Sequence, residues 1–143
     1  MRQISLALSG LLLATAVEAQ EAVTYTYDGE FEDASFGVES AIVNRGLVID
    51  YVSHVGEMLN RTGEDVGSSE RIFEEADIYI FCSAVVSRKA MEADPMNIAH
   101  CPYGVFVAER GGEVMVGYRT YPDGAMQDVQ VLLDQIAQEA VGN

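Results

Sequence analysis

Residues 77–119 read DIYIFCSAVVSRKAMEADPMNIAHCPYGVFVAERGGEVMVGYR, and this stretch decides the fold. Its first eight residues, 77–84, place apolar side chains on both faces of an extended segment. This pattern predicts a central strand that is covered on at least part of each side. A short helix is expected over 85–93, because Asp94 precedes a proline and proline disfavours helix in the residue before it.

The same stretch ends in a predicted hairpin. Strands are expected over 103–109 and 113–119, and the turn between them is Gly111-Gly112. Two strands joined by so short a turn must run antiparallel.

The remaining segments complete one sheet and its helices. The periodicity predicts a strand over 23–27, a helix over 31–45 and a strand over 47–55. It then predicts a loop over 56–69 with a helical turn at 57–60, one or two helical turns over 69–76 and an amphipathic helix over 125–141. This order is typical of the α+β class. We expect a single domain with a mainly antiparallel sheet and helices on one face.

The N-terminus has the layout of a secretory signal peptide. Arg2 is followed by an apolar run over 4–17 and by a cleavage site with small residues that ends at Ala19. The run is shorter than the ~20 residues that a membrane-spanning helix needs. We therefore expect a cleaved signal peptide over 1–19 and a periplasmic or secreted domain over 20–143, with no membrane anchor in the mature chain.

The charge of the chain excludes some partners. The formal net charge is −15, from 23 acidic and 8 basic residues. Such a chain repels phosphate backbones, so nucleic acid is not an expected partner.

The mature chain has two cysteines, Cys82 and Cys101. Cys82 is expected in the middle of a strand and Cys101 just before the next, and neighbouring strands can bring two cysteines within the Cα separation of ~6 Å that a disulfide needs. Export would favour oxidation, and closing this loop would stabilise the fold by roughly 3 kcal/mol. The alternatives are two buried unpaired thiols and a metal or redox role. No CxxC or CxxCH motif is present.

Soft ligand atoms gather near the cysteines. Met96 and His100 precede Cys101, and with Cys82 they form a candidate metal site. Thioether, thiolate and imidazole suit Cu(I), or haem iron through one axial ligand. The alternative is that the methionine fills a core gap and the histidine is an ordinary polar residue.

His54 is a candidate ligand-binding residue. On the strand expected over 47–55 it would share a face with Asp50, and a carboxylate beside a histidine can serve acid–base chemistry. The alternative is two polar residues on the open face of a sheet. No nucleophile elbow or glycine-rich phosphate loop is present.

Residues 77–119 resemble the domain of unknown function 302 family. The resemblance is carried by Phe81-Cys82, Ala90, Ala93-Asp94-Pro95, Cys101-Pro102, Val105-Phe106-Val107 and the segment 114–119. With the flanking elements it spans about residues 24–141. It implies an α+β grip similar to that of the TATA-box-binding protein, a curved antiparallel sheet against a long helix. It also implies a homodimer, and it brings no catalytic residues.

These observations favour an exported, non-catalytic module that binds a small ligand or a soft metal near Cys82, His100, Cys101 and His54. One alternative is a structural or interaction protein stapled by a Cys82–Cys101 disulfide. The other is an enzyme that uses His54 or a cysteine.

Overall fold

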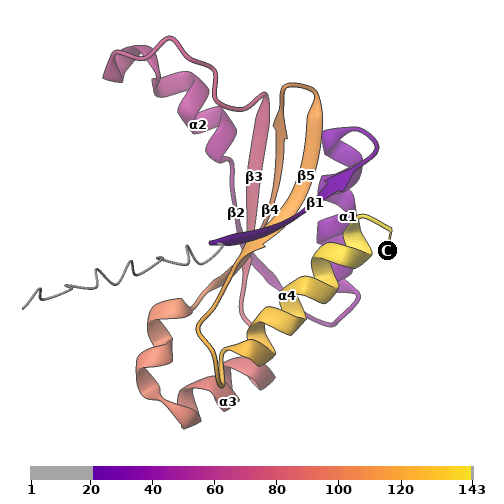
Figure 1. Ribbon diagram of the computed structural model, residues 1–143, viewed down its shortest axis with the longest axis vertical. Coiled ribbons are helices and arrows are strands. Elements are labelled where there is room, and N and C mark those ends of the chain that lie inside the picture. Colours follow the sequence, from indigo (N-terminus) through magenta and orange to yellow (C-terminus); the bar gives the residue numbers. More distant parts are fainter. Residues whose placement is uncertain (1–20, 143) are drawn as a thin grey trace, which may run out of the picture.

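The computed structural model describes residues 21–142, in which five strands and four α-helices are arranged as a sheet with helices packed against it (Figure 1). The strands are β1 (Ala22–Tyr27), β2 (Ile49–Ser53), β3 (Glu75–Phe81), β4 (Tyr103–Arg110) and β5 (Glu113–Arg119). The α-helices are α1 (Phe31–Val43), α2 (Val55–Thr62), α3 (Ala84–Ala93) and α4 (Gln127–Ala140), and 3-10 turns cover Glu64–Val66 and Pro95–His100. The signal peptide expected over 1–19 lies outside the described residues.

The sheet has the order β1-β5-β4-β3-β2, and every pair of neighbours is antiparallel. The β4–β5 hairpin turns at Gly111 and Gly112, whose φ angles of 62° and 77° suit glycine far better than other residues. The prediction of a single α+β domain with a mainly antiparallel sheet is therefore confirmed.

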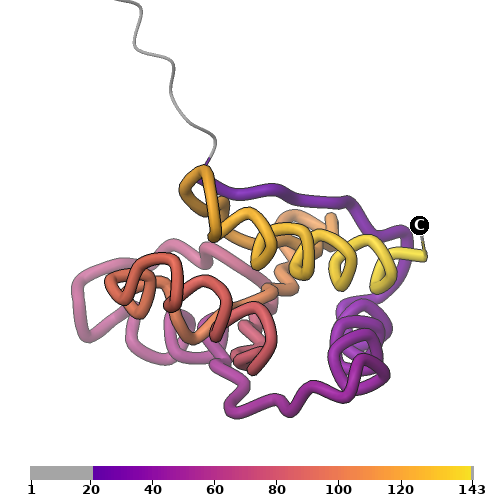
Figure 2. Tube along the Cα trace, turned by 90° about the horizontal axis from the view of Figure 1, so that it is seen from below, coloured from indigo at the N-terminus to yellow at the C-terminus, as the bar shows by residue number. Residues whose placement is uncertain are grey.

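The core lies between the sheet and helices α1 and α4. Inward-facing side chains of the sheet pack against the apolar stripes of the two helices, and most of this cluster is fully buried. The largest fully buried side chains are Phe81, Tyr103, Ile42, Met126, Leu133 and Ile136. The two helices approach closely at Gly37, where an added Cβ would lie 2.7 Å from the Ala140 carbonyl oxygen. Both views place the end of α4 beside α1 (Figures 1 and 2).

Helix α2 corrects the expectation of a loop over 56–69, because the helical turn expected at 57–60 is part of a longer helix. The strand expected over 47–55 ends at Ser53, and the helix begins at Val55. Gly56 is buried against β3, and an added Cβ there would lie 2.5 Å from the Ala76 backbone nitrogen. Packing against the sheet stabilises a helix in a segment, 56–69, whose three glycines and polar residues predict a loop.

Two further expectations were wrong in detail. No helical turn forms over 69–76, where the chain stays irregular until β3 begins at Glu75. The backbone N–H of Glu74 donates to the Glu109 carbonyl at 2.9 Å, which extends the β3–β4 ladder in place of a helix. Cys82 does not lie mid-strand, because β3 ends at Phe81 and α3 begins two residues after Cys82.

The expected helix over 85–93, the hairpin strands and the C-terminal helix are confirmed within one or two residues. Within residues 21–142, no helix has both the length and the apolar character needed to cross a membrane.

Candidate functional site

The first candidate site is the cysteine pair. Cys82 follows β3 and Cys101 precedes β4, and these strands pair at Phe81 and Tyr103. The two sulfur atoms lie 3.0 Å apart, and both residues are free thiols. Cys82 reaches the surface, yet partial burial and the neighbouring Cys101 thiol together raise the pKa of its thiol to about 11.

The other two predicted soft ligands do not join this pair in a metal-binding arrangement. The His100 ring contacts the Tyr121 ring edge-on, with 5.8 Å between centroids, and its buried Nδ1 has no hydrogen-bond partner. Met96 is 70% exposed. Across residues 21–142, no three His, Cys, Asp or Glu side chains are placed to hold a metal ion. Of the four predicted metal ligands, the structure brings together Cys82 and Cys101.

His54 belongs to a second site, and its partner is Asp77. The residue lies between the end of β2 and the start of α2, and its hydrogen-bond partner is Asp77, which the sequence analysis did not consider. Its Nδ1 lies 2.8 Å from Asp77 Oδ1, which belongs to β3. An ionised carboxylate only accepts hydrogen bonds, so Nδ1 carries the proton and Nε2 is left for another partner. His54 is 59% exposed and Asp77 is 16% exposed, so the pair lies at the rim of a cavity.

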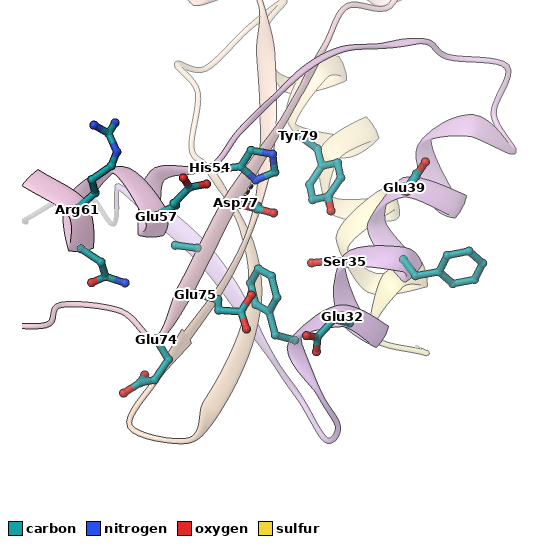
Figure 3. Close-up of a pocket in the computed structure, with 14 residues that line it drawn as sticks. Glu32, Ser35, Glu39, His54, Glu57, Arg61, Glu74, Glu75, Asp77 and Tyr79 are labelled. Atoms are coloured by element: carbon teal, nitrogen blue, oxygen red, sulfur yellow. Dashed lines mark hydrogen bonds and ion pairs between the residues drawn. The ribbon is translucent and has the colours of Figure 1, made fainter.

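That cavity lies between α1, α2 and β3 and has a volume of about 820 Å³. Helix α1 supplies Phe31, Glu32, Ser35, Phe36 and Glu39; α2 and the residue before it supply His54, Glu57, Asn60 and Arg61; β3 and the residue before it supply Glu74, Glu75, Ala76, Asp77 and Tyr79. Figure 3 shows the hydroxyls of Ser35 and Tyr79 pointing into the space between α1 and β3, with the His54–Asp77 pair beside Tyr79. We call this cavity the α1–β3 pocket.

The electrostatics of the α1–β3 pocket are set by burial and by negative charge. Burial raises the pKa of Tyr79, the neighbouring Ser35 hydroxyl opposes that rise, and the carboxylates of Asp77 and Glu39 add to it. The Glu75 side chain is largely exposed, but slight desolvation raises the pKa of its carboxyl group, helped by repulsion from Glu32, Glu109 and Asp77 and opposed by Arg71. Crowded carboxylates of this kind favour a bound proton or a bound cation.

Sequence reasoning missed most of the α1–β3 pocket. Asp77 carried a usable signal, because a carboxylate at the start of an otherwise apolar strand is unusual. Ser35 carried another, since it sits one residue from Ala34 and three from Val38 on the apolar stripe of its helix. No sequence pattern predicted that α1 and α2 lie on two sides of one cavity, because their positions depend on how both helices pack against β3.

Fold and site together define the class: a small α+β domain with one antiparallel sheet and an acidic pocket beside β3. A sequence model of the family described as domain of unknown function DUF302 matches residues 22–141. The match covers most of the chain, and the protein belongs to the DUF302 family.

A solved structure supports the same fold. It is a crystal structure of an uncharacterised conserved DUF302 protein from Bacillus stearothermophilus, with a TM-score of 0.69 and 13% sequence identity. The similarity covers 85% of this chain and 99% of that one. At this level of identity the likeness shows the fold alone. No curated protein matches the chain.

Proposed function

We propose that this protein is an exported, non-catalytic module that binds a small ligand in the α1–β3 pocket. One observation carries the proposal: the hydroxyls of Ser35 and Tyr79 and the His54–Asp77 pair converge on a cavity of about 820 Å³. Small-molecule sites typically enclose about 300–1,000 Å³ and combine apolar walls with a few convergent polar groups. Phe31 and Phe36 supply apolar lining here.

The proposed binding site differs from the one predicted from the sequence. Of the four candidate ligand-binding residues, His54 lines the α1–β3 pocket, whereas Cys82, His100 and Cys101 do not. Enzymatic use of His54 is the alternative, because a histidine oriented by a carboxylate can act as a general base.

A thermal-shift screen tests the proposal. The mature protein is heated with single small molecules that cover cationic, neutral and anionic classes. A ligand that binds the folded state raises Tm, and at a fixed concentration a tighter ligand raises it more. At least one compound should raise Tm in the wild type and lose most of that shift in Ser35→Ala, while Ser69→Ala, an exposed serine outside the α1–β3 pocket, keeps it. Shifts that are equal in both variants would contradict the proposal.

A second candidate function is structural and rests on the cysteine pair. We propose that Cys82 and Cys101 form a disulfide after export. Each thiol loses one proton and one electron, and a disulfide of a cellular thiol oxidant accepts them and becomes two thiols. The 3.0 Å separation of the two sulfur atoms supports this, because little movement is needed to reach bonding distance.

Thiol alkylation with mass spectrometry tests the disulfide. Protein taken from the export compartment is denatured without reductant and treated with iodoacetamide. We expect no alkylation before reduction and two alkylated cysteines afterwards. Two alkylated cysteines before reduction would contradict it. Copper or haem binding and homodimer formation stay predictions.

A further inference from the structure

The lining of the α1–β3 pocket is far more acidic than the chain as a whole. Six of its fourteen residues are carboxylates, namely Glu32, Glu39, Glu57, Glu74, Glu75 and Asp77. The whole chain has 23 acidic residues in 143, so the pocket is enriched beyond the general acidity of the protein. The one arginine of the lining, Arg61, points away from Ser35, Asp77 and Tyr79 (Figure 3). Negative charge concentrated between low-dielectric walls attracts cations.

A buried hydroxyl gives independent evidence of a ligand. Ser35 is 9% exposed, and its Oγ is buried without a hydrogen-bond partner. A buried polar atom without a partner is unfavourable, and a bound group that hydrogen-bonds to it removes that penalty. The Tyr79 hydroxyl points into the same space and is close enough for Ser35 to affect its pKa, but no hydrogen bond of ordinary geometry joins the two hydroxyls (Figure 3). Both hydroxyls can accept hydrogen bonds from an N–H donor.

The form of the cavity favours an organic cation over a metal ion. The pocket volume of about 820 Å³ is far larger than a metal ion, and Phe31, Phe36 and Tyr79 give it apolar and aromatic surface. Aromatic rings attract ammonium groups as well as carbon chains. Across the described part of the chain, no three His, Cys, Asp or Glu side chains are placed to hold a metal.

We propose that the α1–β3 pocket binds a small organic amine, with an ammonium group between the carboxylates of β3 and α1 and its carbon chain against Phe31 and Phe36. This inference rests on the proposed binding function and names the ligand class. The ammonium group donates to Ser35 Oγ and to Asp77, and His54 keeps the Asp77 carboxylate in place through its 2.8 Å hydrogen bond.

Isothermal titration calorimetry with three matched probes tests the proposal. The probes are 1,5-diaminopentane, 1,5-pentanediol and glutarate, which share a five-carbon chain and differ in charge. The mature protein should bind the diamine saturably at one site and bind neither the diol nor the diacid. Losing one hydrogen bond to a charged group weakens binding about tenfold, so we expect that loss in both Ser35→Ala and Asp77→Asn.

The control is Asp65→Asn, which makes the same charge change on the exposed turn outside the α1–β3 pocket. It should keep the wild-type affinity. An equal loss of diamine affinity in Asp65→Asn and Asp77→Asn would mean that the diamine is attracted to the acidic protein in general, and it would overturn the inference. Should Asp77→Asn fail to fold, Glu32→Gln on the exposed side of α1 takes its place, with a smaller loss expected.

The outcomes separate this inference from the proposed function. If the diamine does not bind but a neutral or anionic compound gives a Ser35-dependent thermal shift, the amine inference is wrong and the binding function stands. If no compound of any charge gives a Ser35-dependent shift, both are wrong.

Discussion

At the scale of single residues, the surroundings of Cys82 set how fast its sulfur reacts. Burial and the Cys101 thiol raise its pKa to about 11 from the ordinary value of 9.0. The thiolate, which is the reactive form, is therefore about 100-fold scarcer near pH 8 than for an ordinary thiol. A more basic thiolate is intrinsically more nucleophilic and recovers about tenfold of that. These properties suit a structural disulfide better than a reactive nucleophile.

We therefore expect reduced protein to react with iodoacetamide at Cys82 about tenfold more slowly near pH 8 than a model peptide. The rate should rise with pH until about pH 11. The measurement uses Cys101→Ala, in which the partner thiol is missing, as the comparison. That variant should react faster than the wild type, because one cause of the raised pKa is removed. A wild-type rate equal to that of the peptide would contradict the argument.

Glu75 makes a second prediction at this scale. Its folded-state pKa lies above the ordinary value of 4.5, so the folded protein binds this proton more tightly than the unfolded chain does. The carboxylate therefore destabilises the fold above its folded-state pKa, and the effect disappears as pH falls through that pKa toward the unfolded value. Glu75→Gln should raise the free energy of unfolding near pH 7 by at most about 0.5 kcal/mol, because the side chain is exposed.

Urea unfolding near pH 7 and near pH 3.5 measures this effect. The gain should be absent at the lower pH, where the carboxyl group is protonated in both states. Asp65→Asn controls for the loss of one negative charge from a chain of net charge −15. A gain that is the same at both values of pH, or the same in both variants, would refute this explanation.

At the scale of elements, α2 packs against β3 and approaches its backbone closely at Gly56. An added Cβ on Gly56 would lie 2.5 Å from the Ala76 nitrogen, a distance that real Cβ atoms do not tolerate against backbone. Glycine to alanine inside a helix ordinarily stabilises by about 1 kcal/mol. We expect the opposite sign for Gly56→Ala, a loss of about 1–3 kcal/mol, because α2 must move away from β3.

Chemical denaturation measures that loss, and Gly63→Ala at the C-terminal end of α2 serves as the control. There the nearest atom to an added Cβ is the Ser68 carbonyl oxygen at 3.1 Å, which is tight but can yield because it belongs to a loop. Gly56→Ala should also weaken ligand binding, since α2 carries part of the pocket lining. Stabilisation by Gly56→Ala would show that the contact does not hold the helix.

The elements also show how far sequence reasoning reached. Helix α4 and the β4–β5 hairpin were predictable, because a long apolar stripe and a Gly-Gly turn are strong local signals. Helix α2 was not, because its glycine and polar residues predict a loop and only its packing against β3 makes it a helix.

The two candidate sites also differ in how far the sequence predicted them. The proximity of Cys82 and Cys101 followed from adjacent strands. The partner of His54 lies 23 residues further along the chain and depends on where α2 begins, which local patterns did not predict. Ser35 and Asp77 carried usable local signals, but their convergence required the packed fold.

At the scale of the whole molecule, the first prediction concerns export. We expect the mature chain to begin at Gln20, because the small residues before it fit signal-peptide cleavage after Ala19. Intact-mass measurement of protein from the extracytoplasmic fraction checks this directly. Full-length chain starting at Met1 and confined to the cytoplasm would contradict both export and the oxidation of the cysteines that depends on it.

The central claim is that a small organic amine binds between α1, α2 and β3, and one measurement tests it most directly. It is a titration of the ¹⁵N-labelled mature protein with 1,5-diaminopentane, followed by amide chemical shifts. We predict saturable shifts at Ser35, His54, Asp77 and Tyr79, and none at Cys82 or Cys101. Saturable shifts around the cysteines with none at Ser35 or Asp77 would contradict the account.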